Sequence, residues 1–519
     1  MRAFSPLLSR FTRVSLWILL AALILALGWS LLQLLELAAA SNPAGDSASR
    51  RAAYRATATA MSSSDATSGL SPRWQFVLLQ DASTPAAPPS PTSTTENEAP
   101  NTIPLPTLLV PAKPSSPNLA GTKVPPPAQR IIRAHSLVNI ALLGGDNELT
   151  EDQFVRTDTM VVVSLNLDTG DAAMLSLPRD LFVYMPHGNM GRLNTAYGIG
   201  DYREWQPGGG FGFLRQTLFY NFGINVHYYA LVNFSAFEAV IDRLGGVNIA
   251  VDCAYRDYYP VARDKRGSTN PADYALRTLP VGYHSFDGFD ALWYARTRRN
   301  TSDLDRGRRQ QILLRAMWRA ARQQGLLTAI PSLWGELTSL TETDIPFDLI
   351  LRLLPHLLNL ELDSIEHFTF QSDFHTRDWV ASDGAQVLLP MRDRVHQLMQ
   401  DFYTPPSPNQ ASLAMHSIGI YNASSHENWD IVASERLRWG GHQAIALGTL
   451  TDSQFTESSQ LIDQVGTQKG SPVPRLLAAL NLDAEQVTID PKADRAFDYL
   501  VIIGRDYESC TFDVLPIDE

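Results

Sequence analysis

The 519-residue sequence contains only two cysteines, Cys253 and Cys510. It has no CxxC pair and no His/Cys spacing of the kind that binds zinc, which excludes the common zinc modules. If the domain lies outside the cytoplasm, the two cysteines could form a disulfide, or they could remain two free buried thiols. Sequence leaves this open because pairing requires the Cα atoms to lie within roughly 7 Å.

Several motifs of well-known enzymes are also absent. There is no HExxH zinc motif and no nucleophile elbow. The glycine run 208–212 lacks the GK[ST] ending of a P-loop, so it indicates nucleotide binding only weakly. Asp146 and Asp158 do not fit an EF-hand loop, because the sixth position is not Gly and the twelfth is not Glu. A formal net charge of −12 argues against a broad basic surface, so we predict no nucleic-acid partner.

One long apolar stretch is present, at residues 14–35. About 20 apolar residues span a bilayer as a helix, so the stretch predicts a transmembrane anchor. Arg2, Arg10 and Arg13 precede it, and no Lys or Arg follows until Arg50. The positive-inside rule then predicts a single-pass protein of the cell membrane, with residues 1–13 as a cytoplasmic tail and the main domains outside.

A cleaved signal peptide is the alternative, because residues 38–40 resemble a small-residue cleavage site. The apolar stretch is longer than a typical signal-peptide core, which favours an anchor that is retained. Residues 36–130, rich in Ala, Ser, Thr and Pro, predict a disordered linker, and residues 404–413 predict a second one. Two ordered regions remain, 131–403 and 414–508.

The first ordered region alternates strand and helix patterns. Apolar runs predict strands over 137–143, 160–167, 172–177, 228–233 and 247–251. Helical periodicity or capping predicts helices over 213–221, 235–245, 287–294, 313–322 and 347–358. The pattern favours an α/β fold, a mixed sheet covered by helices. The second region predicts a small α/β module with strands at 417–421, 443–447 and 499–503 and helices at 428–438 and 474–480.

An arginine-rich stretch at residues 295–311 predicts an anion site. Ser302 and Asp305 form a capping-box pattern that begins a helix. Arg306 lies in its first turn, and Arg296 and Arg298 approach from the preceding segment. Guanidinium groups at a helix N-terminus suit phosphate oxygens. The spacing predicts Arg309 on the buried face and Arg308, Arg315 and Arg319 on the solvated face. The alternative is a solvated basic helix paired with acidic neighbours.

Two carboxylates at neighbouring strand ends, Asp146 and Asp158, predict a Mg²⁺ site, because this ion takes oxygen ligands and shares them with substrate phosphates. The alternative is a turn-capping Asp146 and an ion pair between Asp158 and Arg156. A further arginine, Arg179, follows Pro178 at the tip of the third strand. Its neighbour Asp180 could orient it, although a strand-end salt bridge has the same pattern.

Residues 192–197 and the glycine run 208–212 predict loops around this site. In order and spacing, these segments resemble the LytR–CpsA–Psr family of cell-envelope proteins. The matching segments are 139–146, 156–159, 178–180, 192–197, 244–251 and 294–311. The resemblance covers about residues 131–403. Residues 417–504 resemble the LytR-type C-terminal accessory domain often found in this family.

The resemblance implies a phosphotransferase on an α/β/α fold with an apolar tunnel for a polyprenyl tail. Such enzymes move a glycopolymer from an undecaprenyl-pyrophosphate carrier to a hydroxyl of peptidoglycan or a related wall polymer, forming a phosphodiester. The implied partners are the lipid-linked glycan donor, the wall acceptor and the membrane. The implied cofactor is Mg²⁺ or Mn²⁺.

Residue roles follow from the matching positions. Asp146 and Asp158 match the metal-associated aspartates. The positions implied to bind pyrophosphate are Arg156, Arg179, Arg296, Arg298, Arg306, Arg309 and Gln310. Among these, Arg179, Arg298 and Arg306 are implied to act in catalysis, and Asp303 is our choice for the general base. Family members often carry an Arg within a residue or two after the first Asp, but residues 147–149 here are Asn, Glu and Leu. Arg156 is the residue that could supply the missing charge.

Two alternatives belong to other functional classes. One is a non-catalytic protein on the same fold that binds polyprenyl pyrophosphate or glycan. The other is a transcriptional attenuator, a label long attached to this family. The predicted anchor and the charge of −12 argue against DNA contact.

Overall fold

The computed structural model describes residues 124–131, 136–146, 154–404, 416–466, 470–512 and 514–515. The predicted tail and anchor, most of the first linker and nearly all of the second lie outside these residues. Within the described ranges, no helix has both the length and the apolar character needed to cross a membrane.

The main sheet is mixed and has six strands in the order β11-β6-β1-β2-β3-β12. Its strands are β1 (Leu137–Gly145), β2 (Thr157–Asn166), β3 (Ala172–Ser176), β6 (Tyr228–Val232), β11 (Glu342–Thr343) and β12 (Ile365–Phe368). β1 pairs antiparallel with β2 and parallel with β6, and β3 pairs parallel with β12. This confirms the predicted mixed sheet and the first four of its predicted strands.

Helices cover both faces of this sheet. The helices of this domain are α3 (Ala196–Tyr202), α4 (Gly209–Phe222), α5 (Phe234–Arg243), α6 (Gly288–Arg296), α7 (Asp303–Gln323), α8 (Leu326–Leu340), α9 (Phe347–Asn359) and α10 (Arg392–Phe402). Of these, α4 and α10 pack on one face of the sheet, and α7 and α9 pack on the other. Successive residues of a strand point to opposite faces. Accordingly, Val162 packs in the core with α4 and α10, whereas Val161 packs in the core with α9.

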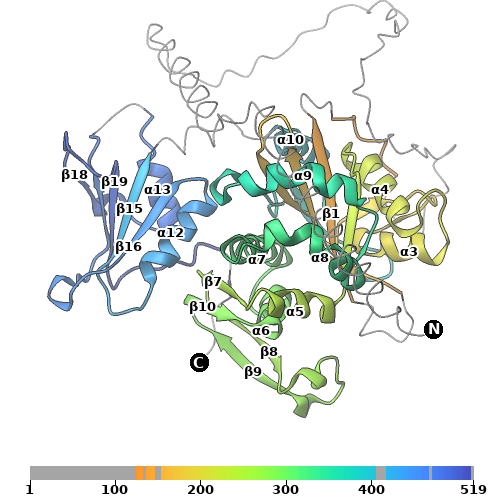
Figure 1. Ribbon diagram of the computed structural model, residues 1–519, viewed down its shortest axis with the longest axis horizontal. Helices are drawn as coiled ribbons and strands as arrows, with labels where there is room; N and C mark the ends of the chain where they lie inside the picture. Colours follow the sequence, from red (N-terminus) through yellow and green to blue (C-terminus); the bar gives the residue numbers. More distant parts are fainter. Residues whose placement is uncertain are drawn as a thin grey trace, which may run out of the picture. The chain divides into compact units, whose positions relative to one another are not determined.

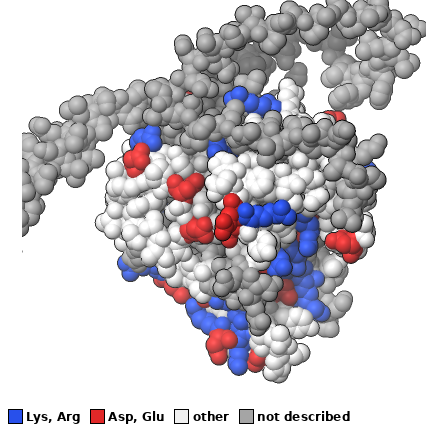
Figure 2. All heavy atoms as spheres, turned by 90° about the vertical axis from the view of Figure 1, so that its right-hand side faces the viewer, with Lys and Arg blue, Asp and Glu red and all other residues white. Residues whose placement is uncertain are grey.

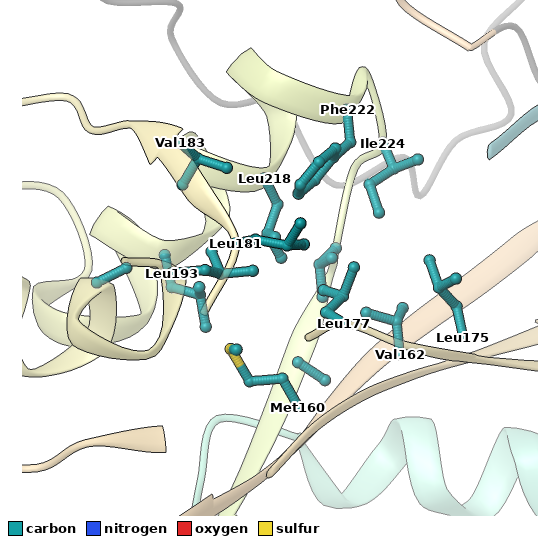
Figure 3. Packing of buried hydrophobic residues seen from close by; sticks show 14 of the residues in the cluster. Met160, Val162, Leu175, Leu177, Leu181, Val183, Leu193, Leu218, Phe222 and Ile224 are labelled. Atoms are coloured by element: carbon teal, nitrogen blue, oxygen red, sulfur yellow. The ribbon is translucent and has the colours of Figure 1, made fainter. Parts of the chain in front are cut away.

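The larger core lies between the sheet and α4 (Figure 3). Met160, Val162 and Leu175 of the sheet meet Leu218 and Phe222 of α4 there, and each is at most 3% exposed. Truncating one such side chain to Ala costs about 2–5 kcal/mol, since it removes buried apolar surface and leaves a cavity. This core fixes the strand ends from which the site residues project.

The glycine run predicted as a loop belongs instead to the start of α4. Gly208 caps the helix with φ 89°, a conformation that favours glycine. A Cβ at Gly210 would lie 2.8 Å from the carbonyl oxygen of Tyr197, and one at Gly212 would lie 1.9 Å from that of Pro207. The run therefore permits close backbone packing of α4 against α3 and the turn before it.

Three hairpins and a further two-stranded sheet extend the domain. The strand pairs are β4 (Phe182–Tyr184) with β5 (Met190–Arg192), β7 (Val247–Val251) with β10 (Gly282–Phe286), β8 (Tyr255–Pro260) with β9 (Tyr274–Leu279), and β13 (Thr376–Val380) with β14 (Gln386–Pro390). Only β7 was predicted from the sequence. Helix α5 begins one residue before the predicted Ser235, and its cap is Asn233, whose side chain accepts from the N–H of Ala236.

The C-terminal module is a five-stranded sheet in the order β16-β15-β19-β17-β18. Its elements are β15 (Ser417–Asn422), α12 (Trp429–Trp439), β16 (Gln443–Thr449), β17 (Gln460–Asp463), α13 (Val473–Leu480), β18 (Val487–Ile489) and β19 (Tyr499–Ile503). Figure 1 shows α12 and α13 beside β15, β16 and β19. All five predicted elements of this module are present.

The C-terminal segment returns to the first domain. Cys510 forms a disulfide with Cys253, which resolves the choice that the sequence left open. Ser509 donates to the carbonyl oxygen of Asp252 at 2.6 Å, and the N–H of Leu515 donates to that of Asn300 at 2.8 Å. The segment thus contacts the chain just before β8 and the loop between α6 and α7.

Candidate active site

Four chain segments converge at one end of β1, β2 and β3. Asp158 occupies a β-bulge, because Gly144 pairs with Thr159 and Gly145 pairs with Thr157. Arg179 and Asp180 follow β3. Arg298 lies in the loop after α6, and Asp303 begins α7. The structure therefore brings together residues predicted from separate motifs.

Arg179 links three carboxylates. Its Nη1 lies 2.9 Å from Asp158 Oδ2, and its Nε lies 3.2 Å from Asp180 Oδ2 and 3.5 Å from Asp303 Oδ1. Burial alone would lower the pKa of Arg179, but the three carboxylates raise it above its ordinary value. Arg179 is thus a permanent cation, fixed in place at the strand end.

Asp158 is held as a carboxylate by the same contacts. Its Oδ1 accepts from the amide of Asn194 at 3.0 Å, and its Oδ2 accepts from Arg179. Burial favours the neutral acid, but Arg179, Asn194 and Arg306 outweigh it and lower the pKa of Asp158. The predicted alternative, an ion pair of Asp158 with Arg156, is wrong: Arg156 pairs with Asp146 instead, at 3.8 Å.

Asp303 lies at the centre of three guanidinium groups. Its Oδ1 lies 2.6 Å from Arg306 Nη2, 3.5 Å from Arg179 Nε and 3.8 Å from Arg298 Nη1. The geometry of these contacts makes none of them a hydrogen bond to that oxygen. One carboxylate therefore balances part of the charge of three arginines, and the guanidinium groups keep donor capacity for another anion.

Arg306 is the most enclosed of these arginines, with 5% of the residue exposed. Its Nη2 also donates to the carbonyl oxygen of Asp158 at 3.2 Å. Burial, reinforced by the neighbouring cation Arg179 and opposed by Asp303, lowers the pKa of Arg306 to about 10. A cation whose desolvation is only partly compensated gains by contacting an anionic ligand.

The loop that carries Arg298 is fixed by Asp257, a residue of β8. Asp257 Oδ2 accepts from the N–H groups of Arg298 at 2.8 Å and Arg299 at 3.2 Å, and from the hydroxyl of Thr297 at 2.8 Å. The guanidinium group of Arg298 stays 45% exposed. Sequence reasoning missed Asp257 because β8 and β9 lack a strong apolar pattern, and it missed the contact of Asn194 with Asp158.

The capping prediction at the start of α7 is half right. Ser302 accepts from the N–H of Asp305 at 3.1 Å, as predicted. The side chain of Asp305 does not return to the cap; it accepts from Thr301, Arg308 and Arg309. Asp305 thus organises the interior behind the site.

The prediction of a solvated face on α7 is wrong for Arg308 and Arg315, which are buried. Each is at most 5% exposed, because the end of the chain and α12 cover this side of the helix. Arg308 donates to both oxygens of Asp252, at 2.8 and 3.1 Å, and stacks on Phe512 at 3.8 Å. Arg319 is also paired, with Glu435 at 2.8 Å.

Arg309 is on the buried face, as predicted, and is 0% exposed. Its guanidinium group donates to Asp305 and to the carbonyl oxygens of Tyr294 and Thr297. These donors are committed to holding the loop after α6. Gln310 donates to the carbonyl oxygen of Ala295 at 3.2 Å and lines the cavity described next.

A cavity of about 350 Å³ adjoins the arginines. Its lining includes Arg179, Arg296, Arg298 and Arg306 together with Asp158, and also Phe234, Phe289, Leu292 and Trp293. The guanidinium group of Arg296 stacks on Phe234 at 4.2 Å. The cavity thus combines cationic and apolar lining, as a ligand with a charged head and an apolar chain requires.

Asp146 and Asp158 supply the oxygen donors that Mg²⁺ prefers. Asp146 follows β1 directly, and its Oδ1 accepts from the N–H of Arg156 at 2.9 Å. Among the described residues no three His, Cys, Asp or Glu side chains cluster as a metal site, so protein ligands alone would be two carboxylates at most. This donor set fits an ion that completes its shell with water and phosphate oxygens.

Acidic and basic side chains lie next to one another on the face drawn in Figure 2, and the basic ones form no broad field there.

Comparison with known proteins gives a consistent result. The LytR_cpsA_psr family model matches residues 113–402, which is more than half of the chain. Polyisoprenyl-teichoic acid–peptidoglycan teichoic acid transferase TagU of Oceanobacillus iheyensis is 30% identical over 227 residues, covering 43% of this chain and 64% of the relative. The regulatory protein MsrR of Staphylococcus aureus is 30% identical over 210 residues, covering 40% and 57%.

The matched region spans less than two thirds of the length of both relatives. Among solved structures, that of Bacillus subtilis TagV matches with a TM-score of 0.42 and 21% identity, covering 52% of this chain and 99% of the other.

Proposed function

Because this chain belongs to the LytR_cpsA_psr family, we propose that it is a cell-envelope phosphotransferase. It would move a glycopolymer from an undecaprenyl-pyrophosphate carrier to a hydroxyl of peptidoglycan or a related wall polymer. The main observation that supports this proposal is the cavity, whose lining combines arginines with apolar side chains. The names of relatives such as TagU, a teichoic acid transferase, support the same reaction class.

In this proposal Arg179, Arg298 and Arg306 bind the pyrophosphate, and the polyprenyl chain lies against the apolar side chains of the lining. The acceptor hydroxyl oxygen bonds to the sugar-proximal phosphorus, and the bond from that phosphorus to the bridging oxygen breaks. Polyprenyl monophosphate leaves, and the glycan stays attached through a phosphodiester. Such transfers depend on positioning and charge neutralisation more than on covalent help from the protein.

Asp146 and Asp158 are the residues that would hold Mg²⁺ or Mn²⁺, which when bound neutralises charge on phosphate oxygens. Asp303 holds the three arginines in position before the donor binds. As general base it would accept the proton of the acceptor hydroxyl after pyrophosphate displaces it from the guanidinium groups. Arg156, near Asp146, supplies charge where other family members carry an Arg after the first Asp.

A location outside the cytoplasm is part of the proposal. The pairing of Cys253 with Cys510 supports it, because disulfides persist in oxidising compartments and are rare in the cytosol. The anchor predicted at residues 14–35 would keep the enzyme at the membrane that holds its lipid substrate.

The test is a transfer assay with the purified full-length chain. It is incubated with a polyprenyl-pyrophosphate oligosaccharide, a peptidoglycan fragment and Mg²⁺, and the products are identified by mass. We expect a phosphodiester-linked product whose formation stops on addition of EDTA. Asp146→Ala should fold normally, as shown by an unchanged melting temperature, and lose transfer.

Two results would change the assignment. Binding of the pyrophosphate lipid without any transfer would support the non-catalytic binding protein. Tight, salt-sensitive DNA binding in a gel-shift assay would support a regulatory role, the function that the name of MsrR states for that protein.

A further inference from the structure

A second, larger hollow lies on the other side of the strand end that carries Arg179. It is a groove of about 960 Å³ lined by the β4–β5 hairpin, the β13–β14 hairpin, the start of α10 and residues 125–129. It shares no lining residue with the arginine cavity of the proposed active site. Its size is that of a binding site for a ligand of several rings.

The floor of the groove is aromatic. Trp379 of β13 packs against Phe182 of β4 with ring centroids 5.6 Å apart, and Met190 and Val387 complete this small core. Trp379 is only partly buried and lines the groove. A flat aromatic face with adjacent polar groups is suited to the face of a sugar ring, which is apolar on its C–H side and polar at its rim.

The rim is cationic in a chain of net charge −12. Arg377, Arg392 and Arg394 line the groove and are exposed, against one carboxylate, Asp393. In the described part of the chain, none of the three guanidinium groups forms an ion pair; Arg392 donates to the carbonyl oxygen of Pro127, and Arg394 stacks on Phe374. Unpaired arginines favour carboxylate or phosphate groups on a ligand.

The groove is coupled to the active site through the backbone. The N–H of Leu388 in β14 donates to the carbonyl oxygen of Asp180 at 2.9 Å, and Leu181 and Leu388 form a β-bridge. Phe182 is three residues from Arg179, and three residues of extended chain span at most about 11 Å. The groove and the arginine cavity therefore lie on the same short stretch of backbone.

We propose that this groove is a subsite for an anionic glycan chain, which Trp379 and the arginines of the rim would bind. The inference rests on the proposed transferase function and adds the place where a glycan substrate lies. The carboxylates of a wall glycan and the phosphates of a glycopolymer are both anions that the rim arginines could bind. The experiment therefore compares these two sources.

The experiment measures binding of soluble glycans to the purified full-length chain by calorimetry. The probes are a disaccharide-peptide fragment of peptidoglycan, a phosphate-bearing glycopolymer fragment and an uncharged N-acetylglucosamine oligosaccharide of similar length. We expect at least one anionic probe to bind more tightly than the neutral one. Which anionic probe binds identifies the occupant as acceptor or donor glycan.

Variants then locate the binding. The double variant Arg377→Ala/Arg394→Ala should weaken binding of the anionic probe by about tenfold or more, and Trp379→Ala should do the same. Trp379→Phe, which keeps an aromatic face, should retain most of the affinity. Arg352→Ala, which removes an equally exposed arginine on α9, is the matched control and should change nothing.

The proposal is overturned if no glycan binds, if the neutral probe binds as well as the anionic ones, or if the groove variants bind like the wild type. Arg179→Ala separates the two hypotheses: it should lose polyprenyl-pyrophosphate binding and keep glycan binding. If the wild type binds the glycan in the groove but no pyrophosphate lipid, the transferase proposal fails and the groove assignment stands.

Discussion

Helix α7 contributes to two arginine clusters that differ in how their charge is satisfied. On one side Arg306 of α7 meets Arg179 and Arg298 around Asp303, next to a cavity. On the other side Arg308 and Arg309 donate to Asp252, Asp305, Tyr255 and backbone carbonyls in the interior. The residues are neighbours in sequence and carry the same charge.

The difference shows in the pKa values. Burial would lower the pKa of Arg308, but Asp252, Tyr255 and Asp305 raise it well above its ordinary value. The pKa of Arg306 falls to about 10, because its burial is not fully compensated. An arginine with saturated donors stabilises the fold, whereas one with unused donors is prepared for a ligand. We call these the saturated cluster (Arg308, Arg309) and the open cluster (Arg179, Arg298, Arg306).

The largest effect should come from breaking the saturated cluster. Asp305→Ala leaves two buried guanidinium groups without their shared carboxylate, which should cost about 3–5 kcal/mol of unfolding free energy. Denaturant unfolding followed by circular dichroism measures this cost. Asp348→Ala, which removes the partner of an exposed arginine, should change stability by less than about 0.5 kcal/mol. Equal costs for both variants would contradict the distinction.

Breaking the open cluster should leave stability nearly unchanged and reduce activity. Arg179→Ala and Arg298→Ala should each lower the transfer rate by about 100- to 1000-fold, as loss of one charge-stabilising donor typically does. Arg298→Lys keeps the charge but loses the fork that matches phosphate oxygens, so it should restore only part of the rate. A melting temperature that falls as much as in Asp305→Ala would show that the open cluster is structural after all.

The next effect on stability should come from the C-terminal segment that covers the saturated cluster. Cys253→Ser removes the link between Cys510 and the turn before β8, the strand that carries Asp257. Removing a native disulfide of this kind costs about 2–4 kcal/mol. Unfolding of the variant and of the reduced wild type should coincide. Transfer at a temperature where the variant is folded should stay close to wild type, since no open-cluster residue is changed.

The smallest effect should be a pH dependence of stability that arises at His367, outside both arginine clusters. His367 Nε2 accepts from Nη1 of Arg315 at 2.9 Å, and its ring stacks on Trp439 of the C-terminal module. Burial, with Arg315 nearby, lowers the pKa of His367 well below its ordinary value, so the folded state keeps it neutral. The unfolded chain takes up the proton first, and stability is lost as pH falls below about 6.5.

Between pH 6.5 and 5.5 this should cost about 1 kcal/mol. His367→Gln, which keeps a hydrogen-bonding side chain that does not titrate, should show a shallower pH dependence of unfolding over this range. His442, whose pKa burial lowers to about 4, and the other histidines whose pKa values burial lowers should supply the slope that remains; these are His187, His356, His375 and His416. An unchanged slope would show that His367 is charged in the folded state.

Local patterns in the sequence predicted much of the fold. The strands of the main sheet carry continuous apolar runs, and α6 is capped by Asp287 as its position indicated. The β8–β9 and β13–β14 hairpins were missed, because their exposed strands lack a strong apolar pattern and their pairing depends on packing. The helical periodicity of α7 was correct, but its predicted solvated face is covered by residues more than a hundred positions away.

Sequence reasoning identified the residues of the site better than it identified the contacts between them. Arg179, Arg298, Arg306, Asp303 and Asp158 do converge, because strand ends and a helix start meet at one edge of the sheet. Which carboxylate pairs with which arginine depends on a β-bulge, and no local pattern placed it. Asp257 and Asn194, which hold the loop and the bulge residue, come from segments whose contacts are set by the tertiary fold.

The pairing of Cys253 with Cys510 closes a covalent ring across a sequence separation of 257 residues. The ring includes α7 and the whole five-stranded sheet of the C-terminal module. A single backbone cut by a protease anywhere inside it would leave one molecule, whose two pieces separate only after reduction. The arginine-bearing helix and the module that packs behind it would therefore stay together after damage that divides an unlinked chain in two.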